Sequence, residues 1–420
     1  MAIDRPPGGG VGMMTLIEAG ASDAADPLHS VRDRFALPEG VIYLDGNSLG
    51  ALPRTTPARL QQVATQQWGD GLIRSWNAHD WIGAARRIGA KIAPFIGAQP
   101  DEVVVADSTS ANLYKLLVAA LKARPGRATI LSEPGNFPTD LYIADGAAWS
   151  VGDARIRTVP VDTIVDAIDD DVAVVMLTHV HYKSGAMLDM AGITAAAQAR
   201  GALVLWDLSH SVGAVPLDLT GCNADLAVGC GYKYLNGGPG APAFLYVAKR
   251  HHATLRSPLS GWLGHAAPFD FSDDYAPAAD ISRFQCGTPP ILALAALEEG
   301  IAQFDGVDRD ALIAKSRALG DSCIALVEAR CPELTLISPR DAARRGSHVS
   351  FRHPHAYAIC QALIDRGVIG DFRAPDALRL GFAPLYIGFA DVWRAVDILR
   401  RILDDRSWDD PRYHARNAVT

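Results

Sequence analysis

The 420-residue chain lacks the features that mark several classes of protein. Its uninterrupted apolar runs, such as residues 172–177, fall far short of the roughly 18 residues that a membrane-spanning helix needs. No apolar core of a secretion signal follows the first methionine, so we expect a cytoplasmic protein. Basic residues (39) are fewer than acidic ones (47), and the net charge of −8 argues against a protein that binds a nucleic-acid backbone.

Cysteine and metal-ligand patterns are also sparse. The six cysteines are scattered without a Cys-x-x-Cys pair, so we expect neither a disulfide framework nor a structural zinc site. Two His-x-His pairs occur, His179/His181 and His353/His355, but no cluster of Cys, Asp or Glu at ligand spacing flanks them. We therefore predict no metal site.

What is present is an alternation of short β-branched runs with helical stretches. The predicted strands are 102–106, 128–131, 156–159, 172–178, 202–207, 225–229 and 243–247, and the helices between them are 110–123, 139–148 and 193–200. This order predicts an α/β fold with a mostly parallel sheet covered by helices on both faces, in which ligands bind beyond the carboxyl ends of the strands.

The pattern changes near residue 290. Long helices at about 290–304, 309–330 and 389–404 surround short strands near 334–338, 348–351 and 377–382. We predict a flexible tail at 1–27, an N-terminal segment at 28–55 associated with the small domain, a large domain at 56–288, and a small α+β domain at 289–420.

Two residues at predicted strand ends carry the chemistry. Asp207 closes a buried strand, and a buried carboxylate is costly unless it meets a positive group, although Asp207 could equally cap the next helix. Lys233 follows a later strand among aromatic and small residues, where desolvation favours a neutral, nucleophilic amine. The alternative for Lys233 is a surface lysine in a glycine-rich loop; no Gly-Lys-Ser/Thr follows as in a Walker motif.

An aspartate at one strand end and a lysine at another suit pyridoxal phosphate. The lysine forms a Schiff base with this cofactor, and the carboxylate keeps the pyridine nitrogen protonated. The sequence Asp-Ser-Thr-Ser at residues 107–110 precedes a predicted helix, so hydroxyls and free backbone N–H groups converge there as phosphate donors. Each hydroxyl alone is also explained as a helix cap.

Five stretches together resemble the kynureninase family of pyridoxal-phosphate enzymes. They are Gly-Asn-Ser-Leu-Gly (46–50), Asn-Phe-Pro-Thr-Asp (136–140), Asp-Leu-Ser-His (207–210), Tyr-Lys-Tyr-Leu-Asn (232–236) and Gly-Trp-Leu-Gly-His (261–265). The resemblance runs from about residue 28 to the C-terminus and implies a fold type I, aminotransferase class V-like homodimer with shared active sites. Leu263 departs from it, because family members often carry a second tryptophan there.

The resemblance implies a role for each matching residue. Lys233 would hold the cofactor and move the α-proton, Asp207 would pair with the pyridine nitrogen, and Tyr232 would be the general base for carbonyl hydration. The implied cofactor contacts are Thr109, Ser110, Phe137, Pro138, Thr139, Asp140, Thr178, Asp207, His210, Tyr232, Lys233, Trp262 and Thr288. Trp262 and Thr288 would come from the partner subunit. The alternatives are that Phe137 and Trp262 are core aromatics and that Thr288 is a helix cap.

The implied reaction is hydrolytic cleavage of the Cβ–Cγ bond of L-kynurenine, or its 3-hydroxy form, to anthranilate or 3-hydroxyanthranilate and L-alanine. The implied pathway is tryptophan degradation, which feeds NAD biosynthesis. The predicted substrate contacts are Arg379, Asn47 and His79, although His79 is equally explained as a loop histidine. Arg379 interrupts an apolar strand and needs an anion, which is either the substrate carboxylate or a structural Asp or Glu; Arg373 is the second choice.

Other functions on the same fold stay open. A cysteine desulfurase needs a thiol in a long flexible loop, and none of Cys286, Cys323, Cys331 and Cys360 lies in one. An aminotransferase is not excluded by the sequence. A non-catalytic regulator that only binds the cofactor is disfavoured because Lys233 and Asp207 are both present.

Overall fold

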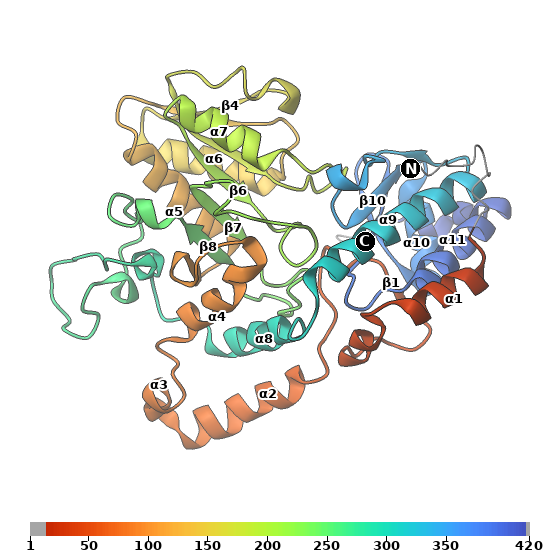
Figure 1. Ribbon diagram of the computed structural model, residues 1–420, viewed down its shortest axis with the longest axis horizontal. Coiled ribbons are helices and arrows are strands. Elements are labelled where there is room, and N and C mark those ends of the chain that lie inside the picture. Colours follow the sequence, from red (N-terminus) through yellow and green to blue (C-terminus); the bar gives the residue numbers. More distant parts are fainter. Residues whose placement is uncertain (1–13, 417–420) are drawn as a thin grey trace, which may run out of the picture.

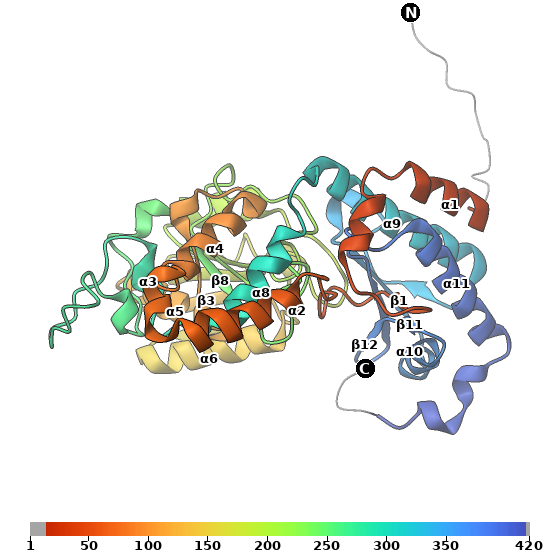
Figure 2. The same cartoon turned by 90° about the horizontal axis from the view of Figure 1, so that it is seen from below.

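The computed structural model describes residues 14–416, which form two units side by side (Figures 1 and 2). The larger unit is built on a seven-stranded sheet and the smaller one on a four-stranded sheet. No helix within residues 14–416 combines the length and the apolarity that crossing a bilayer requires.

The seven-stranded sheet has the order β2-β8-β7-β6-β5-β3-β4. Its strands are β2 (Val103–Val105), β3 (Thr129–Ser132), β4 (Arg155–Thr158), β5 (Val172–Thr178), β6 (Leu203–Asp207), β7 (Leu226–Gly229) and β8 (Phe244–Val247). Strands β3 to β7 pair in parallel, whereas β8 is antiparallel to both of its neighbours. The predicted mostly parallel sheet is confirmed, because short apolar and β-branched runs are a local signal for buried strands.

Alternate side chains of the strands feed two separate cores. Ile130, Met176 and Leu205 pack under α5 (Thr109–Lys122) and α6 (Pro138–Val151). Leu131, Leu177 and Val204 face the opposite core, which α4 (Ala84–Ile92), α7 (Met190–Ala199) and α8 (Ile291–Ala302) help to build. The sheet is therefore covered on both faces, which leaves its carboxyl edge as the place where polar side chains gather.

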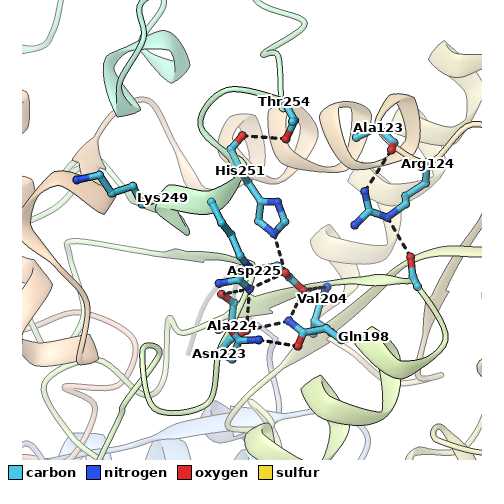
Figure 3. A network of polar contacts seen from close by, with 12 residues as sticks. Ala123, Arg124, Gln198, Val204, Asn223, Ala224, Asp225, Lys249, His251 and Thr254 are labelled. Atoms are coloured by element: carbon cyan, nitrogen blue, oxygen red, sulfur yellow. Dashed lines mark hydrogen bonds and ion pairs between the residues drawn. The ribbon is translucent and has the colours of Figure 1, made fainter.

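Asp225 fixes the start of β7 (Figure 3). Its carboxylate accepts hydrogen bonds from the backbone N–H of Val204 (3.0 Å), Gln198 Nε2 (3.1 Å), Arg250 Nη2 (2.8 Å) and His251 Nε2 (2.7 Å). These donors come from β6, from α7 and from the turn after β8, so one buried carboxylate holds three neighbouring elements together. This network anchors the start of β7 beside β6, in addition to the backbone pairing of the two strands.

The four-stranded sheet of the smaller unit is antiparallel, with the order β12-β13-β10-β9. Its strands are β9 (Thr335–Leu336), β10 (His348–Arg352), β12 (Asp371–Arg373) and β13 (Ala377–Gly381), and its helices are α9 (Arg309–Arg330), α10 (Ala356–Asp365) and α11 (Phe389–Asp404). Strand β1 (Ile42–Tyr43) pairs in parallel with β11 (Val368–Ile369), which attaches the N-terminal segment to this unit.

The prediction of a flexible tail over residues 1–27 is wrong where the structure describes it. Residues Leu16–Ala25 form helix α1, which packs on α11 (Figure 2). A capping box between Thr15 and Glu18 starts the helix, and Asp23 accepts hydrogen bonds from the backbone N–H groups of Phe389 (2.6 Å) and Ala390 (3.0 Å). The Pro-Pro-Gly run on which the tail was predicted lies outside the described residues.

Helix α8 also bears on the domain organisation. It packs against α2 (Thr56–Gln62) and α4, which both belong to the larger unit, and the chain enters the smaller unit only at α9. We therefore place the boundary between α8 and α9 rather than at residue 289. The short helix α3 (Ser75–Ala78) and the π-helical stretch Val63–Asp70 complete the N-terminal side of the larger unit.

Candidate active site

The predicted carboxylate and amine lie at the same edge of the large sheet. Asp207 is the last residue of β6, and Lys233 follows shortly after the end of the adjacent parallel strand β7. The Asp207 side chain is buried, and its Oδ1 accepts a hydrogen bond from the backbone N–H of Ser209 (2.7 Å). Lys233 Nζ lies 6.0 Å from the ring centroids of both Phe137 and Tyr232, so aromatic faces border the amine.

A second buried carboxylate and an imidazole face this edge. Burial raises the pKa of Asp140 well above its usual range, and the neighbouring Asp207 carboxylate raises it further. Burial lowers the pKa of His210 well below its usual range, and the nearby charge of Lys233 adds to the shift. Asp140 Oδ2 and His210 Nδ1 are buried without a hydrogen-bond partner. Two carboxylates and an unsatisfied ring nitrogen at one place fit a polar ligand that brings positive charge.

The loop from β3 to α6 presents Phe137 to this place. The Asn136 side-chain oxygen accepts hydrogen bonds from Thr178 Oγ1 and from the backbone N–H of Phe137 (2.7 Å), which ties the loop to the end of β5. Phe137 is 40% exposed, and its ring meets Tyr182 edge-on at 5.4 Å. Pro138 then begins α6 and Thr139 follows it. A fixed and partly exposed aromatic ring is thus available for stacking.

A cavity of about 450 Å³ adjoins Tyr232 at the N-terminus of α5. Its walls include Asp107, Ser108, Thr109, Ser110, Tyr232, Gln285, Cys286 and Thr288. Ser108 caps the helix, with its Oγ accepting from the backbone N–H of Ala111 (3.2 Å). Burial raises the pKa of Tyr232, so its hydroxyl remains a donor. Hydroxyls and helix N–H groups directed at one space form a typical phosphate site.

Arg379 has a structural partner, which is one of the two anions that the sequence left open. Its Nε donates to Asp371 Oδ1 (2.7 Å), and its Nη2 pairs with Asp371 Oδ2 and reaches Ser48 Oγ (3.0 Å). Its Nη1 donates to the backbone carbonyl of Tyr182. When the oxygen and nitrogen of the Asn47 amide are exchanged so that each faces a suitable partner, the oxygen accepts hydrogen bonds from Nη2 and Nε of Arg379, both at 3.1 Å.

Arg373 and Asp45 complete this charged cluster. Arg373 Nη2 lies 2.7 Å from Asp371 Oδ2, and the Arg373 side chain is half-buried with its Nε unpartnered. Burial would raise the pKa of Asp371, but the charges of Arg379 and Arg373, together with hydrogen bonds from Arg379 and Ser48, outweigh it and lower the pKa. Burial and then the charge of Asp371 raise the pKa of Asp45 to about 7. Two guanidinium groups thus meet the Asp371 carboxylate, whose pKa is lowered, and the Asp45 carboxyl, whose pKa is raised.

The single chain does not bring Trp262 and His79 to this edge. Trp262 lies in a separate loop, where it meets Trp76 (6.3 Å) and Phe269 (5.8 Å) edge-on. His79 is exposed just after α3, and Trp76 is the residue of that stretch that contacts Trp262. Thr288 lines the α5 cavity of its own chain.

Sequence reasoning missed three residues that shape the site. Asn136 belongs to the Asn-Phe-Pro-Thr-Asp stretch, and the tendency of asparagine side chains to hydrogen-bond nearby backbone in turns is the signal for its role. Asp371 carries no local signal, because it meets Arg379 only through strand pairing. Tyr182 bridges Phe137 and Arg379 through its ring and its carbonyl. Among the described residues, no group of three or more His, Cys, Asp or Glu is placed to hold a metal ion.

The fold is shared with enzymes of known structure. A cysteine desulfurase from Thermococcus onnurineus NA1 superposes with a TM-score of 0.76 at 20% identity, covering 90% of this chain and 98% of that one. A mutant of C-DES with glycine covalently linked to its PLP cofactor gives a TM-score of 0.75 at 17% identity, covering 87% and 99%. The predicted fold type I architecture is confirmed.

Similarity in sequence is much closer to another group. A family model described as the kynureninase C-terminal domain matches residues 312–399. A kynureninase from Burkholderia mallei (strain SAVP1) is 53% identical over 417 residues, covering 97% of this chain and all of the relative. A kynureninase from Pseudomonas fluorescens is 51% identical with the same coverage. The chain therefore belongs to the kynureninase family.

Proposed function

We propose that the protein is a pyridoxal-phosphate enzyme that hydrolyses the Cβ–Cγ bond of L-kynurenine or its 3-hydroxy form, releasing anthranilate or 3-hydroxyanthranilate and L-alanine. The observation that carries the proposal is the placement of Asp207 and Lys233 at one sheet edge, in a chain with full-length kynureninase relatives. When bound, pyridoxal phosphate supplies an electron-accepting ring that stabilises negative charge at the substrate Cα.

The residues of the site fit this cofactor. Thr109, Ser110 and Tyr232 line the α5 cavity and would hold the phosphate. Asp207 would pair with the protonated ring nitrogen, which offsets the cost of the two buried carboxylates. Phe137 would stack on the ring, with Pro138 and Thr139 supporting it. Asp140, Thr178 and His210 would contact its polar edge, where Asp140 Oδ2 and His210 Nδ1 lack partners.

Protein groups would carry the remaining tasks. The Lys233 amine would bind the cofactor covalently and then take and return the proton at the substrate Cα. The Tyr232 hydroxyl, bordering both the cavity and Lys233, is our candidate for directing water onto the γ-carbonyl. Arg379, held in place by Asp371, would bind the substrate carboxylate together with Asn47. His79 would contact the substrate ring only if assembly brings it to a site.

We infer further that the enzyme is a homodimer with shared active sites in the cytoplasm. A loop near residues 258–277 projects from the larger unit (Figure 2) and exposes Phe269 and Phe271, the latter 78% exposed. Exposed aromatic residues on a projecting loop favour a partner surface. Trp262 lies on this loop, which supports its assignment to the partner's site, whereas Thr288 lines the α5 cavity of its own chain, so its assignment to the partner rests on the family resemblance alone. Tryptophan degradation leading to NAD biosynthesis is the proposed pathway.

A spectrum of the purified protein tests the function. We expect a cofactor absorption band, and anthranilate fluorescence on addition of kynurenine. Alanine formed without a keto-acid acceptor separates hydrolysis from an aminotransferase reaction, and absence of both products would contradict the proposal. A desulfurase is disfavoured because burial raises the pKa of Cys323 and of Cys331 to about 12, which keeps both thiols protonated.

Mixed dimers test the shared sites. Lys233→Ala and Thr288→Ala are each expected to be inactive as homodimers. If Thr288 serves the partner's site, mixing the two variants restores part of the activity through hybrid dimers with one intact site. Hybrids that stay inactive, while both homodimers are folded and dimeric by sedimentation, would place Thr288 in its own chain's site, as the cavity geometry allows.

A further inference from the structure

The proposed phosphate cavity has no cationic side chain in its walls. Its lining residues are hydroxyl-bearing, small or apolar, apart from Gln285, Cys286 and the single charged residue Asp107. The Asp107 side chain is 36% exposed at this cavity. A phosphate carries close to two negative charges at neutral pH, so a lone carboxylate in the wall would repel it.

The negative charge of Asp107 is balanced by Lys115, which is not itself one of the residues that line the cavity. It lies on α5, and its side chain is fully buried. Its Nζ donates to Asp107 Oδ2 (2.8 Å) and to the backbone carbonyl of Phe284 (2.7 Å). Burial lowers the pKa of Lys115, and the Asp107 carboxylate opposes the shift. A buried ammonium group is unfavourable without a partner, so the ion pair with Asp107 stabilises the charged form of Lys115.

The same lysine connects both walls of the cavity. Asp107 begins the Asp-Ser-Thr-Ser turn and has a left-handed backbone with φ +47°, a conformation that costs a non-glycine residue energy. Phe284 leads into the segment 285–290, which also lines the cavity. One ammonium therefore holds the strained turn and the facing segment at a fixed separation.

We infer that Lys115 is a positioning residue that neutralises Asp107 and fixes the cavity walls so that the cavity accepts the phosphate group of the cofactor. This inference rests on the proposed function, because it takes the α5 cavity as the phosphate site. Lys115 acts through Asp107 and Phe284 and touches neither substrate nor the reacting atoms.

Comparing the binding of pyridoxal phosphate with that of pyridoxal isolates the contribution of the phosphate group to affinity. The full-length protein is freed of cofactor, and both ligands are titrated by absorbance to give two dissociation constants. We expect Lys115→Met to weaken pyridoxal phosphate about tenfold or more, since an unpaired Asp107 then faces the phosphate, and to leave pyridoxal within about twofold. Equal weakening of both ligands, or no weakening, would overturn the inference and show a merely structural lysine.

Removal of both charges gives a second test. The double variant Lys115→Met/Asp107→Asn removes both charges, and we expect it to recover most of the preference for pyridoxal phosphate. If Lys115→Met does not fold, Asp107→Asn is compared with the double variant, and the inference predicts the stronger preference where Lys115 is retained. A preference that is the same in these two variants contradicts it.

A matched control is Lys315, which is also buried and forms an ion pair with Asp26 (2.6 Å), but in the smaller unit. Lys315→Met should lower stability without changing either dissociation constant. A wild-type protein that does not prefer pyridoxal phosphate over pyridoxal would count against the proposed function itself, whereas the variant results concern only Lys115.

Discussion

Arg379 and Asp371 are register partners on the antiparallel strands β13 and β12, and their side chains form a two-point ion pair. Both side chains are almost fully buried. The pair fixes the plane of the guanidinium, while Arg373 adds a second positive charge beside the same carboxylate. With Asp45 protonated the cluster has a net charge of about +1, which leaves it able to accept one substrate carboxylate.

Replacing Arg379 by Lys keeps the charge and removes the planar fork. We expect the KM for kynurenine to rise about 10- to 100-fold with the cofactor spectrum intact, because one charge-assisted hydrogen bond contributes about 1.5–3 kcal/mol. Arg373→Lys is the matched variant and should change KM much less. If only Arg373→Lys weakens binding, the substrate carboxylate binds Arg373 and Arg379 serves Asp371 alone.

The titration of Asp45 should link substrate binding to pH. Its pKa is raised to about 7, so raising the pH from 6 to 8 ionises it and removes the net positive charge of the cluster. We therefore expect the KM for kynurenine to rise with pH over this range, by at most about tenfold per pH unit. Asp45→Asn should flatten this dependence, and an unchanged profile in that variant would assign the titration to the substrate or another group.

Structural features that depend on residues close together in the sequence could be predicted, whereas contacts between residues far apart in the sequence could not. Strand β5 and helix α11 were predicted with the bounds that the structure has, because apolar runs and periodicity are local signals. The sequence also predicts Asp207 and Lys233 at one edge of the sheet, since Asp207 ends β6, Lys233 follows β7 and these two strands are parallel. The partners of Arg379 were not predicted, because the pairing of β12 with β13 brings Asp371 there.

For helix α1, the sequence predicted a flexible tail where the structure has a helix. Its residues are mostly small or polar, and Ala19 is the one that is fully buried. The helix forms because Thr15 and Glu18 cap it and because Asp23 binds the N-terminus of α11, a contact between residues far apart in the chain. Composition alone made this segment resemble a tail.

Lys233→Ala should abolish turnover and the absorption band of covalently bound cofactor, while the protein still folds. Lys233 is the lysine beside both Phe137 and Tyr232. The far-ultraviolet circular dichroism spectrum checks folding, and borohydride reduction followed by peptide mapping locates the modified lysine. Lys183→Ala is the control, because Lys183 lies in the loop after β5; a band lost only in that variant would move the assignment to Lys183.

Asp207→Asn should retain the covalent linkage but lose kcat. An amide cannot keep the pyridine nitrogen protonated, so the ring would stabilise charge at Cα poorly. We expect a loss on the order of 100-fold or more, the range for removing one electrostatic group from an active site. Near-normal kcat would show that Asp207 only anchors the Ser209 turn.

Asp225→Asn tests how much the hydrogen-bond network at the start of β7 stabilises the larger unit. The carboxylate is 3% exposed and accepts charged hydrogen bonds from Arg250 and, when protonated, His251 (Figure 3). We expect a loss of about 2–4 kcal/mol in the free energy of unfolding at pH 7, because Arg250 and the buried backbone N–H of Val204 lose a charged acceptor. Asp101→Asn, which breaks a surface pair with Lys249, is the control and should change stability little.

The pH dependence of this loss has a definite sign. Burial alone would raise the pKa of Asp225, but hydrogen bonds from His251, Gln198 and Arg250 outweigh it and lower the pKa below its usual range. A lowered folded-state pKa stabilises the protein above the unfolded value of about 3.9, and the stabilisation disappears as the pH falls through the folded-state value. Urea titrations should therefore show the largest difference between wild type and Asp225→Asn near neutral pH and a shrinking difference below about pH 4. A difference that grows on acidification would mean that Asp225 is held protonated in the folded protein, and the network would then need another source of its strength.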